Sequence, residues 1–126
     1  MKEGEKKRIL VLEDEKPLAH ALELKLSKEG FEVVVANNGD RGAELLSKET
    51  FDVVLSDLII PGTDGFGILE MIKNKKLKVP VIVMTNLNQE EDRKKAEDLG
   101  ASDFFVKSNS TVSQIVEGVK NKIHSA

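Results

Sequence analysis

Five short apolar runs recur along the chain, and each is followed by a stretch with helical spacing. The runs are RILVLE (8–13), FEVVVA (31–36), FDVVLSD (51–57), VPVIVMT (79–85) and DFFVK (103–107). Four of them are almost continuously apolar and rich in Val and Ile, which is typical of strands that are covered on both faces in a parallel sheet. FEVVVA is the least apolar of the five and is the candidate for an edge strand.

The segments between the runs predict helices. Leu18, Leu22 and Leu26 recur every fourth residue, with Pro17 suited to a first helical turn and Gly30 to the helix end. Shorter helices are expected over 40–49, 66–76 and 88–99. A last helix is indicated by an apolar stripe made of Val112, Ile115, Val116, Val119 and Ile123.

Strands that alternate with helices five times predict an α/β fold, (βα)5, with a parallel sheet between two layers of helices. Right-handed crossovers leave few strand orders, and a doubly wound, flavodoxin-like sheet of order 2-1-3-4-5 is favoured. Ligands of such sheets bind outside the carboxyl ends of the strands, at the switch between strands 1 and 3. The 126 residues contain no linker or change of composition, so we expect a single domain over 1–126 with no effector domain.

Composition excludes several classes of protein. The chain has no cysteine, which rules out disulfides and thiolate metal sites. Its net charge of −3 gives no electrostatic footprint for direct nucleic-acid binding. No apolar run approaches the roughly 18 residues of a membrane span, and ILVL meets Glu13 too early for a signal peptide. We therefore expect a cytoplasmic protein without a membrane partner.

Polar side chains gather where the predicted strands end. Strand 1 ends in Glu13 and Asp14, strand 3 in Asp57, strand 4 in Thr85 and strand 5 in Lys107. In a parallel sheet all five side chains lie along one edge. Each residue also has an ordinary structural interpretation: Asp14 as a helix N-cap, Thr85 as a strand-end hydroxyl and Lys107 as a solvated surface lysine. Their coincidence at four strand ends favours a functional site.

Three carboxylates at one edge require a compensating charge. Two of them about 4–5 Å apart repel by roughly 3–4 kcal/mol at an effective dielectric constant of about 20. Either one carboxyl stays protonated or a cation lies among them, and an all-oxygen donor set suits Mg²⁺. His20 and His124 are expected on the surface. Mg²⁺ beside a nucleophilic carboxylate, a hydroxyl and an ammonium group is suited to phosphoryl transfer.

The chain resembles the receiver domains of response regulators in two-component signalling, over essentially its whole length. The resemblance rests on ILVLEDE, VVLSDLIIPGTDG, VPVIVMT and GASDFFVK, which together are highly specific. It implies a phosphoprotein in which Asp57 accepts a phosphoryl group from the phosphohistidine of a histidine kinase or phosphotransfer protein. It also implies a downstream protein target, a possible phosphorylation-dependent dimer, and no enzymatic activity beyond the protein's own phosphorylation and slow dephosphorylation.

The resemblance assigns a role to each residue of the predicted site. Asp14 and Asp57 would bind Mg²⁺ through their side chains, Glu13 through water and Ile59 through its main-chain carbonyl. Thr85 would close onto the phosphoryl oxygens and Lys107 would pair with them. Phe104 would move inward as a packing switch in the space that Thr85 leaves, and the fourth and fifth helices would carry the change to a partner. Pro61 and Gly65 match the turn positions of the loop after the acceptor.

Three residues depart from the family pattern, and two others bear on the rate of dephosphorylation. Ser108 stands where proline usually follows the lysine, so the loop either takes a trans path or stores strain. Asn86 replaces a small residue, and Phe104 a frequent tyrosine. Ile59 and Leu87 are apolar at positions that line the path of attacking water, and neither can position water or act as a base. These two residues predict slow self-dephosphorylation.

Other functions fit the sequence less well. An aspartate-nucleophile phosphatase of the haloacid dehalogenase type needs a second acid two residues after the nucleophile, where this chain has Ile59. A flavin-binding module would need a Ser-, Thr- or Gly-rich loop after strand 1, where this chain has EDEKP. A pseudo-receiver, which binds proteins without phosphate, stays open as the alternative because of Ser108 and Asn86.

Overall fold

The computed structural model of the protein describes residues 6–124, in which strands and helices alternate as expected. Residues 1–5 and 125–126, at the ends of the expected domain, lie outside the described part. The elements are β1 (Arg8–Leu12), α1 (Lys16–Lys28), β2 (Glu32–Ala36), α2 (Gly39–Lys48), β3 (Val53–Ser56), α3 (Gly65–Asn74), β4 (Val81–Thr85), α4 (Glu90–Asp98), β5 (Asp103–Val106), the 3-10 helix η1 (Lys107–Asn109) and α5 (Val112–His124).

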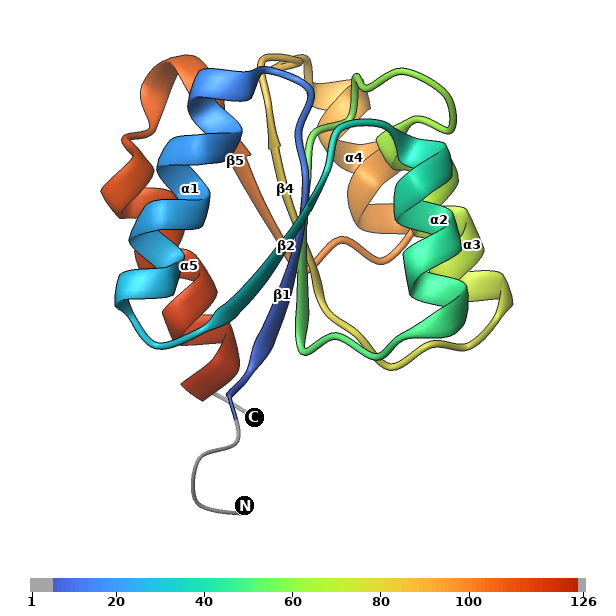
Figure 1. Ribbon diagram of the computed structural model, residues 1–126. Coiled ribbons are helices and arrows are strands. Elements are labelled where there is room, and N and C mark those ends of the chain that lie inside the picture. Colours follow the sequence, from blue (N-terminus) through green and yellow to red (C-terminus); the bar gives the residue numbers. More distant parts are fainter. Residues whose placement is uncertain (1–5, 125–126) are drawn as a thin grey trace.

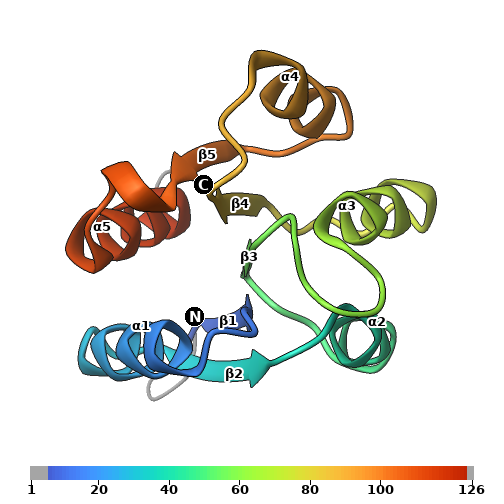
Figure 2. The same ribbon diagram turned by 90° about the horizontal axis from the view of Figure 1, so that it is seen from above.

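The strands form one parallel sheet in the order β2-β1-β3-β4-β5, which confirms the predicted topology. Helices α1 and α5 cover one face of the sheet, and α2, α3 and α4 cover the other (Figures 1 and 2). The least apolar run became β2, which lies at the edge as expected. Its three valines are only half-buried.

Two apolar clusters form the core, one on each side of the sheet. Alternate residues of β1 divide between them, because successive side chains of a strand point to opposite faces. Ile9 and Val11 pack with Leu22 and Leu26 of α1 and with residues of α5. Leu10 and Leu12 pack on the other side with residues of α2 and α3. All four β1 side chains are fully buried, which explains why this run is apolar without alternation.

The strands end one residue earlier than the sequence predicts at three of the five carboxyl ends, so Glu13, Asp57 and Lys107 lie just beyond the strands, whereas Thr85 is the last residue of β4. Glu13 and Asp57 nevertheless stay in the backbone ladder: Glu13 N–H donates to Ala36 O (3.1 Å) and Asp57 N–H donates to Leu12 O (3.1 Å). Their positions are therefore fixed by the sheet even though neither belongs to a strand.

Helices α4 and α5 are attached to the core in different ways. Helix α5 buries Ile115, Val116 and Val119 against the sheet. Among its nine described residues, α4 buries only Ala96. Two of its three cations lie on aromatic rings instead: Arg93 is 5.3 Å from the ring centroid of Phe104, and Lys95 Nζ is 4.3 Å from that of Phe66.

At the amino end of the sheet, Arg8 gathers three acids. Its guanidinium pairs with Glu32 and Glu49 at 2.7 Å each, and its main-chain N–H donates to Asp52 Oδ2 (2.7 Å). The same guanidinium donates to Thr50 O and lies 4.7 Å from the ring centroid of Phe51. These contacts join β1, β2 and the segment before β3, and we call them the Arg8 cluster.

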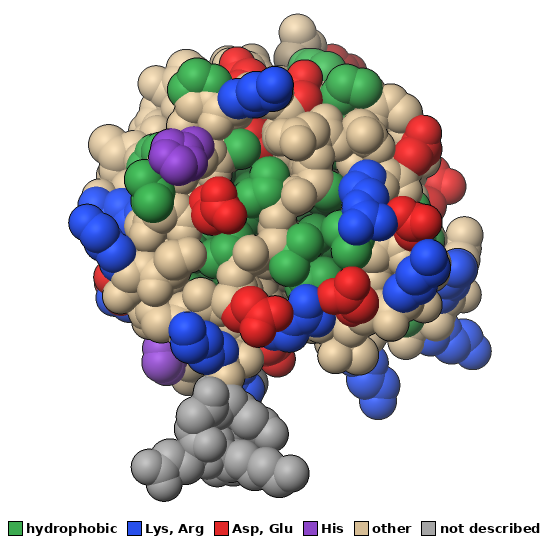
Figure 3. Space-filling view, viewed as in Figure 1, with side chains coloured by type: hydrophobic (Ala, Val, Ile, Leu, Met, Phe, Trp, Pro, Cys, Tyr) green, Lys and Arg blue, Asp and Glu red, His purple; other side chains and the backbone are tan. Residues whose placement is uncertain are grey.

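Acidic and basic side chains are interspersed over the face of the molecule seen in Figure 3, and small groups of hydrophobic side chains are visible between α1 and α2, where β2 runs. This face carries no extended basic patch. No helix within residues 6–124 is both long enough and apolar enough to cross a bilayer.

Candidate functional site

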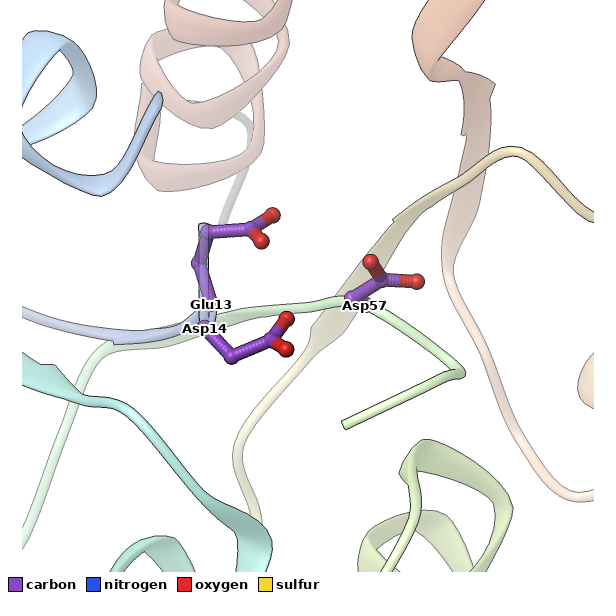
Figure 4. Close-up of side chains that lie close together, drawn as sticks. All are labelled: Glu13, Asp14 and Asp57. Atoms are coloured by element: carbon purple, nitrogen blue, oxygen red, sulfur yellow. The ribbon is translucent and has the colours of Figure 1, made fainter. Parts of the chain in front are cut away.

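The carboxyl ends of β1 and β3 bring three acids together. Glu13 and Asp14 follow β1, Asp57 follows β3, and each of them offers an oxygen within 4.8 Å of the others. Their carboxyl groups extend into one region between the two strand ends (Figure 4). Glu13 and Asp57 are buried, whereas Asp14 is exposed. The predicted clustering of the three carboxylates is therefore present.

Lys107, the first residue after β5, reaches across to these acids. Its Nζ lies 2.5 Å from Asp57 Oδ2, 2.7 Å from Glu13 Oε1 and 3.1 Å from Glu15 Oε2. The lysine side chain is only 10% exposed, so these contacts form largely out of water. Lys107 is thus an acid-bound lysine and not a solvated one.

The surroundings raise the pKa of both Glu13 and Lys107, for different reasons. Burial raises the pKa of Glu13 and outweighs the opposing effects of Lys107 and of the Glu15 N–H, which donates to Glu13 Oε2. Burial lowers the pKa of Lys107, but the close contacts of its ammonium group with the Asp57 and Glu13 carboxylates outweigh this effect and raise the pKa well above its usual value. Lys107 therefore stays charged at neutral pH.

One oxygen of the cluster lacks a hydrogen bond. Glu13 Oε1 is the buried side-chain polar atom without a hydrogen-bond donor among residues 6–124, although Lys107 Nζ lies close to it as an ion pair. Three carboxylates whose oxygens lie within 4.8 Å of one another form an all-oxygen donor set, which hard divalent cations prefer. The residues present therefore fit a Mg²⁺ ion, with one lysine supplying part of the compensating charge.

The loop after β3 holds Asp57 in place. Ile59 N–H donates to Asp57 Oδ1 (3.1 Å), while the Ile59 side chain is 59% exposed. Gly65 packs so tightly on the backbone that a Cβ there would collide with Asp57 O. Gly62 turns this loop with a φ of 78°, a value that residues other than glycine rarely adopt. The PGTDG motif thus supplies the turn and close approach.

Thr85 ends β4 with its side chain fully buried. Its Oγ1 accepts a hydrogen bond from Leu87 N–H (3.3 Å), so the hydroxyl is bonded to the backbone of the loop that follows β4. Leu87 packs partly against the core cluster. A shallow pocket of about 240 Å³ opens over the strand ends, lined by Asp14, Glu15, Asp57, Ile59, Thr85, Asn86 and Lys107.

Phe104 lies on β5 beneath α4. Its ring is half-buried against the core cluster shared by α2, α3 and α4, and Arg93 covers the ring. Because β5 also positions Lys107, the ring and the ammonium group are three residues apart on the same strand end. The ring that Arg93 covers and the lysine of the site thus lie on one short segment of the chain.

Sequence reasoning missed two contacts of the site. Glu15 was not expected to reach Lys107, although its place directly after two acids was the available signal. Asn86 Oδ1 accepts a hydrogen bond from Ser108 N–H (3.0 Å), so the two departures from the family pattern meet in space. Nothing in their sequence positions signalled this contact.

Two structural alternatives are also resolved. Asp14 is not the N-cap of α1, because Glu15 occupies that position. Every peptide bond in the described part of the chain is trans, so the loop through Ser108 takes the trans path.

The comparisons with known proteins agree with this geometry. The family model described as "Response regulator receiver domain" matches residues 9–120. A response regulator receiver domain protein from Methanospirillum hungatei superimposes with a TM-score of 0.89 at 24% identity, covering 96% of each chain. The non-phosphorylated HemR receiver domain from Leptospira biflexa gives 0.86 at 28% identity, covering 94% of each chain.

A third similar structure is the receiver domain of a signal transduction histidine kinase from Syntrophus aciditrophicus. It gives a TM-score of 0.84 at 27% identity, covering 95% of this chain and 92% of that one. The residues that match the family model include the three acids of the cluster and Lys107. The chain therefore belongs to the response regulator receiver domain family.

Proposed function

We propose that this receiver domain accepts a phosphoryl group on Asp57 as one step of a two-component phosphorelay. The observation that carries the proposal is the contact of Asp57 with Lys107 at the base of a pocket that Thr85 and two further acids share. The donor would be the phosphohistidine of a histidine kinase or phosphotransfer protein. A cytoplasmic location would give access to kinases that use ATP.

In the proposed reaction a carboxylate oxygen of Asp57 attacks phosphorus, and the P–N bond to the donor histidine breaks. The imidazole leaves with the electron pair of that bond and takes up a proton. Lys107 then exchanges its contact with Asp57 Oδ2 for the phosphoryl oxygens, which its permanent charge favours. Thr85 rotates away from Leu87 N–H, and its hydroxyl donates a hydrogen bond to another phosphoryl oxygen.

Asp14 and Asp57 would hold Mg²⁺ through their side chains, with the Ile59 carbonyl as a further ligand and Glu13 acting through water. When bound, the ion would neutralise charge on the phosphoryl oxygens during transfer. Lys107 contributes charge from the carboxyl end of β5, and Ile59 N–H keeps the Asp57 carboxylate oriented.

The signal would leave the site through Phe104. Movement of Thr85 opens space that the Phe104 ring can fill, which removes the surface on which Arg93 of α4 lies. Moving a population from 1:99 to 99:1 needs about 5.5 kcal/mol of differential stabilisation, which several charge-assisted hydrogen bonds can supply. A downstream protein, or a second copy in a phosphorylation-dependent dimer, would bind the changed α4–β5–α5 surface.

The phosphorylated state should persist without a partner phosphatase. Ile59 lines the pocket, and neither it nor Leu87 carries a group that positions water. We expect the aspartyl phosphate of the unaltered protein to outlive that of an Ile59→Asn, Leu87→Glu double variant, measured as decay after removal of the donor. Equal or faster decay in the unaltered protein would contradict this prediction.

The direct test is incubation with acetyl phosphate and Mg²⁺, followed by intact-mass measurement of the protein and of an Asp57→Ala variant. We expect the mass to rise by one phosphoryl group in the unaltered protein alone. No gain in either protein would refute the phosphoacceptor role and leave the phosphate-independent protein-binding module as the function.

A further inference from the structure

One hydrogen bond ties together two loops that carry site residues. Ser108 N–H donates to Asn86 Oδ1 across 3.0 Å, although the residues are 22 apart in the sequence. Asn86 directly follows Thr85 at the end of β4, and Ser108 directly follows Lys107 at the end of β5. The bond therefore connects the chain immediately beyond the hydroxyl with the chain immediately beyond the ammonium group.

Apart from the ion pairs of the Lys107 side chain, the turn that carries this lysine has few attachments. Lys107 begins η1, a three-residue 3-10 helix that buries none of its residues and whose N-cap, Val106, makes no side-chain capping bond. The first N–H groups of a helix lack partners within it. Asn86 satisfies one of them at Ser108, the second residue of η1. The backbone that orients the lysine is thus held from the neighbouring loop.

Asn86 also belongs to the pocket itself. It lines the opening together with Thr85 and Lys107. Both Asn86 and Ser108 are exposed, so their hydrogen bond competes with water and contributes little to the stability of the fold. A bond that matters little for folding and joins two loops of the site is better explained by positioning.

We propose that Asn86 is a positioning residue. Through Ser108 N–H it fixes the start of η1, so that Lys107 and Thr85 reach the phosphoryl group as one unit. The proposal rests on the phosphoacceptor function of Asp57. It gives the two departures from the family pattern a joint role, because the main-chain donor at Ser108, which a proline would lack, is the group that Asn86 needs.

Two variants remove the bond from opposite sides. Asn86→Ala deletes the acceptor, and Ser108→Pro deletes the donor. In each we expect the rate constant for phosphorylation by acetyl phosphate at saturating Mg²⁺ to fall by roughly 2- to 10-fold, the effect of losing one such hydrogen bond. Thermal unfolding, measured alongside, should change little because both residues are exposed.

The double variant tests whether the two residues act through each other. If they do, Asn86→Ala combined with Ser108→Pro should be no slower than the slower single variant, because residues joined by one interaction are not additive. Fold-changes that multiply would mean independent effects and would overturn the proposal.

Hydrogen exchange at the Ser108 amide supplies a readout that does not depend on phosphorylation. Exchange should accelerate in Asn86→Ala and return close to its original rate in Asn86→Asp, which restores an acceptor at the same distance along the side chain. An amide that exchanges equally in the unaltered protein and in Asn86→Ala would show that the bond does not hold η1, and the proposal would fail.

Asn88→Ala is the matched control, because Asn88 is an exposed asparagine of the same loop. Its phosphorylation rate and Ser108 exchange should equal those of the unaltered protein. If the unaltered protein takes up no phosphoryl group, the phosphoacceptor function fails and this proposal falls with it. If it is phosphorylated and Asn86→Ala reacts at the same rate, only the positioning role is lost.

Discussion

The two ends of the sheet each hold one cation among three acids, yet the two groups differ in what surrounds them. The Arg8 cluster lies at the amino end, where its arginine, Glu32 and Glu49 side chains are 25%, 52% and 41% exposed. At the carboxyl end Lys107 meets Glu13, Asp57 and Glu15, and the first two acids are 0% and 7% exposed.

The difference in burial decides how each group behaves. In the Arg8 cluster a planar guanidinium and a main-chain N–H donate hydrogen bonds to the acids, and water screens the remaining negative charge. Around Lys107 a single point charge serves three acids, Asp14 adds a fourth carboxylate, and Glu13 Oε1 keeps no hydrogen bond. The first arrangement is complete as it stands, whereas the second is ready to accept a further cation.

Truncating the two cations should separate the clusters most clearly. Lys107→Ala leaves Glu13 and Asp57 buried without their partner, and we expect it to lower the free energy of unfolding by about 3 kcal/mol in metal-free buffer. Arg8→Ala removes exposed pairs and one aromatic contact, and should cost about 1 kcal/mol. Urea unfolding of both variants measures these values. Equal costs would contradict the distinction between the clusters.

Mg²⁺ should stabilise only the carboxyl end. At a concentration of about 100 times its dissociation constant, a ligand that binds the folded state alone adds roughly 2.7 kcal/mol to the free energy of unfolding. We expect this increase in the unaltered protein and in Glu49→Gln, and its loss in Asp57→Asn. Thermal melts with Mg²⁺ and with chelator measure it, and an increase that survives in Asp57→Asn would place the ion elsewhere.

The pH dependence of stability should contain a contribution from Glu13. Because burial raises its pKa in the folded state, the stability it contributes is present below its unfolded pKa of about 4.3 and is lost as pH rises through the higher folded value. The Glu13→Gln variant has no carboxyl group at this position and does not lose this stability as the pH rises. Without metal, its free energy of unfolding relative to that of the unaltered protein should therefore increase from about pH 4 towards neutrality. A constant difference across that range would contradict the direction of the shift.

The smallest effect is expected at Glu15, the exposed partner of Lys107. Its side chain is 60% exposed, so Glu15→Gln should change the free energy of unfolding by less than about 0.5 kcal/mol. It also removes an anion from the pocket and frees Lys107 for phosphate. We expect phosphorylation by acetyl phosphate to accelerate by roughly 2-fold, given the usual worth of such exposed pairs. A slower rate would assign Glu15 a supporting role instead.

The fold was predictable because its determinants are local and repeated. Apolar strands such as VVLS (53–56) and the alternating helices predict a parallel sheet, and right-handed crossovers leave few strand orders, of which 2-1-3-4-5 was the favoured one. The acid cluster was predictable for the same reason, since parallel strands deliver Glu13, Asp14 and Asp57 to one edge. The assigned roles, including those of Thr85, Ile59 and Phe104, stay predictions.

Contacts between loops were not predictable. The meeting of Asn86 with Ser108, and of Glu15 with Lys107, depends on side-chain rotamers and on the path of irregular backbone beyond the strands, for which sequence periodicity carries no information. The 3-10 turn at Lys107–Asn109 was missed for the same reason. Three carboxyl ends were also placed one residue too far, because the charged residue that follows each apolar run was counted as part of the strand.

The sparse attachment of α4 has a consequence for how such a protein diversifies. With Ala96 as its one buried residue among 90–98, the helix can change most of its outward side chains without disturbing the core. New binding preferences can therefore arise there while the chemical centre stays intact. If a downstream protein binds α4 as proposed, a designer could redirect that binding by changing these outward positions while keeping Ala96, Arg93 and Lys95.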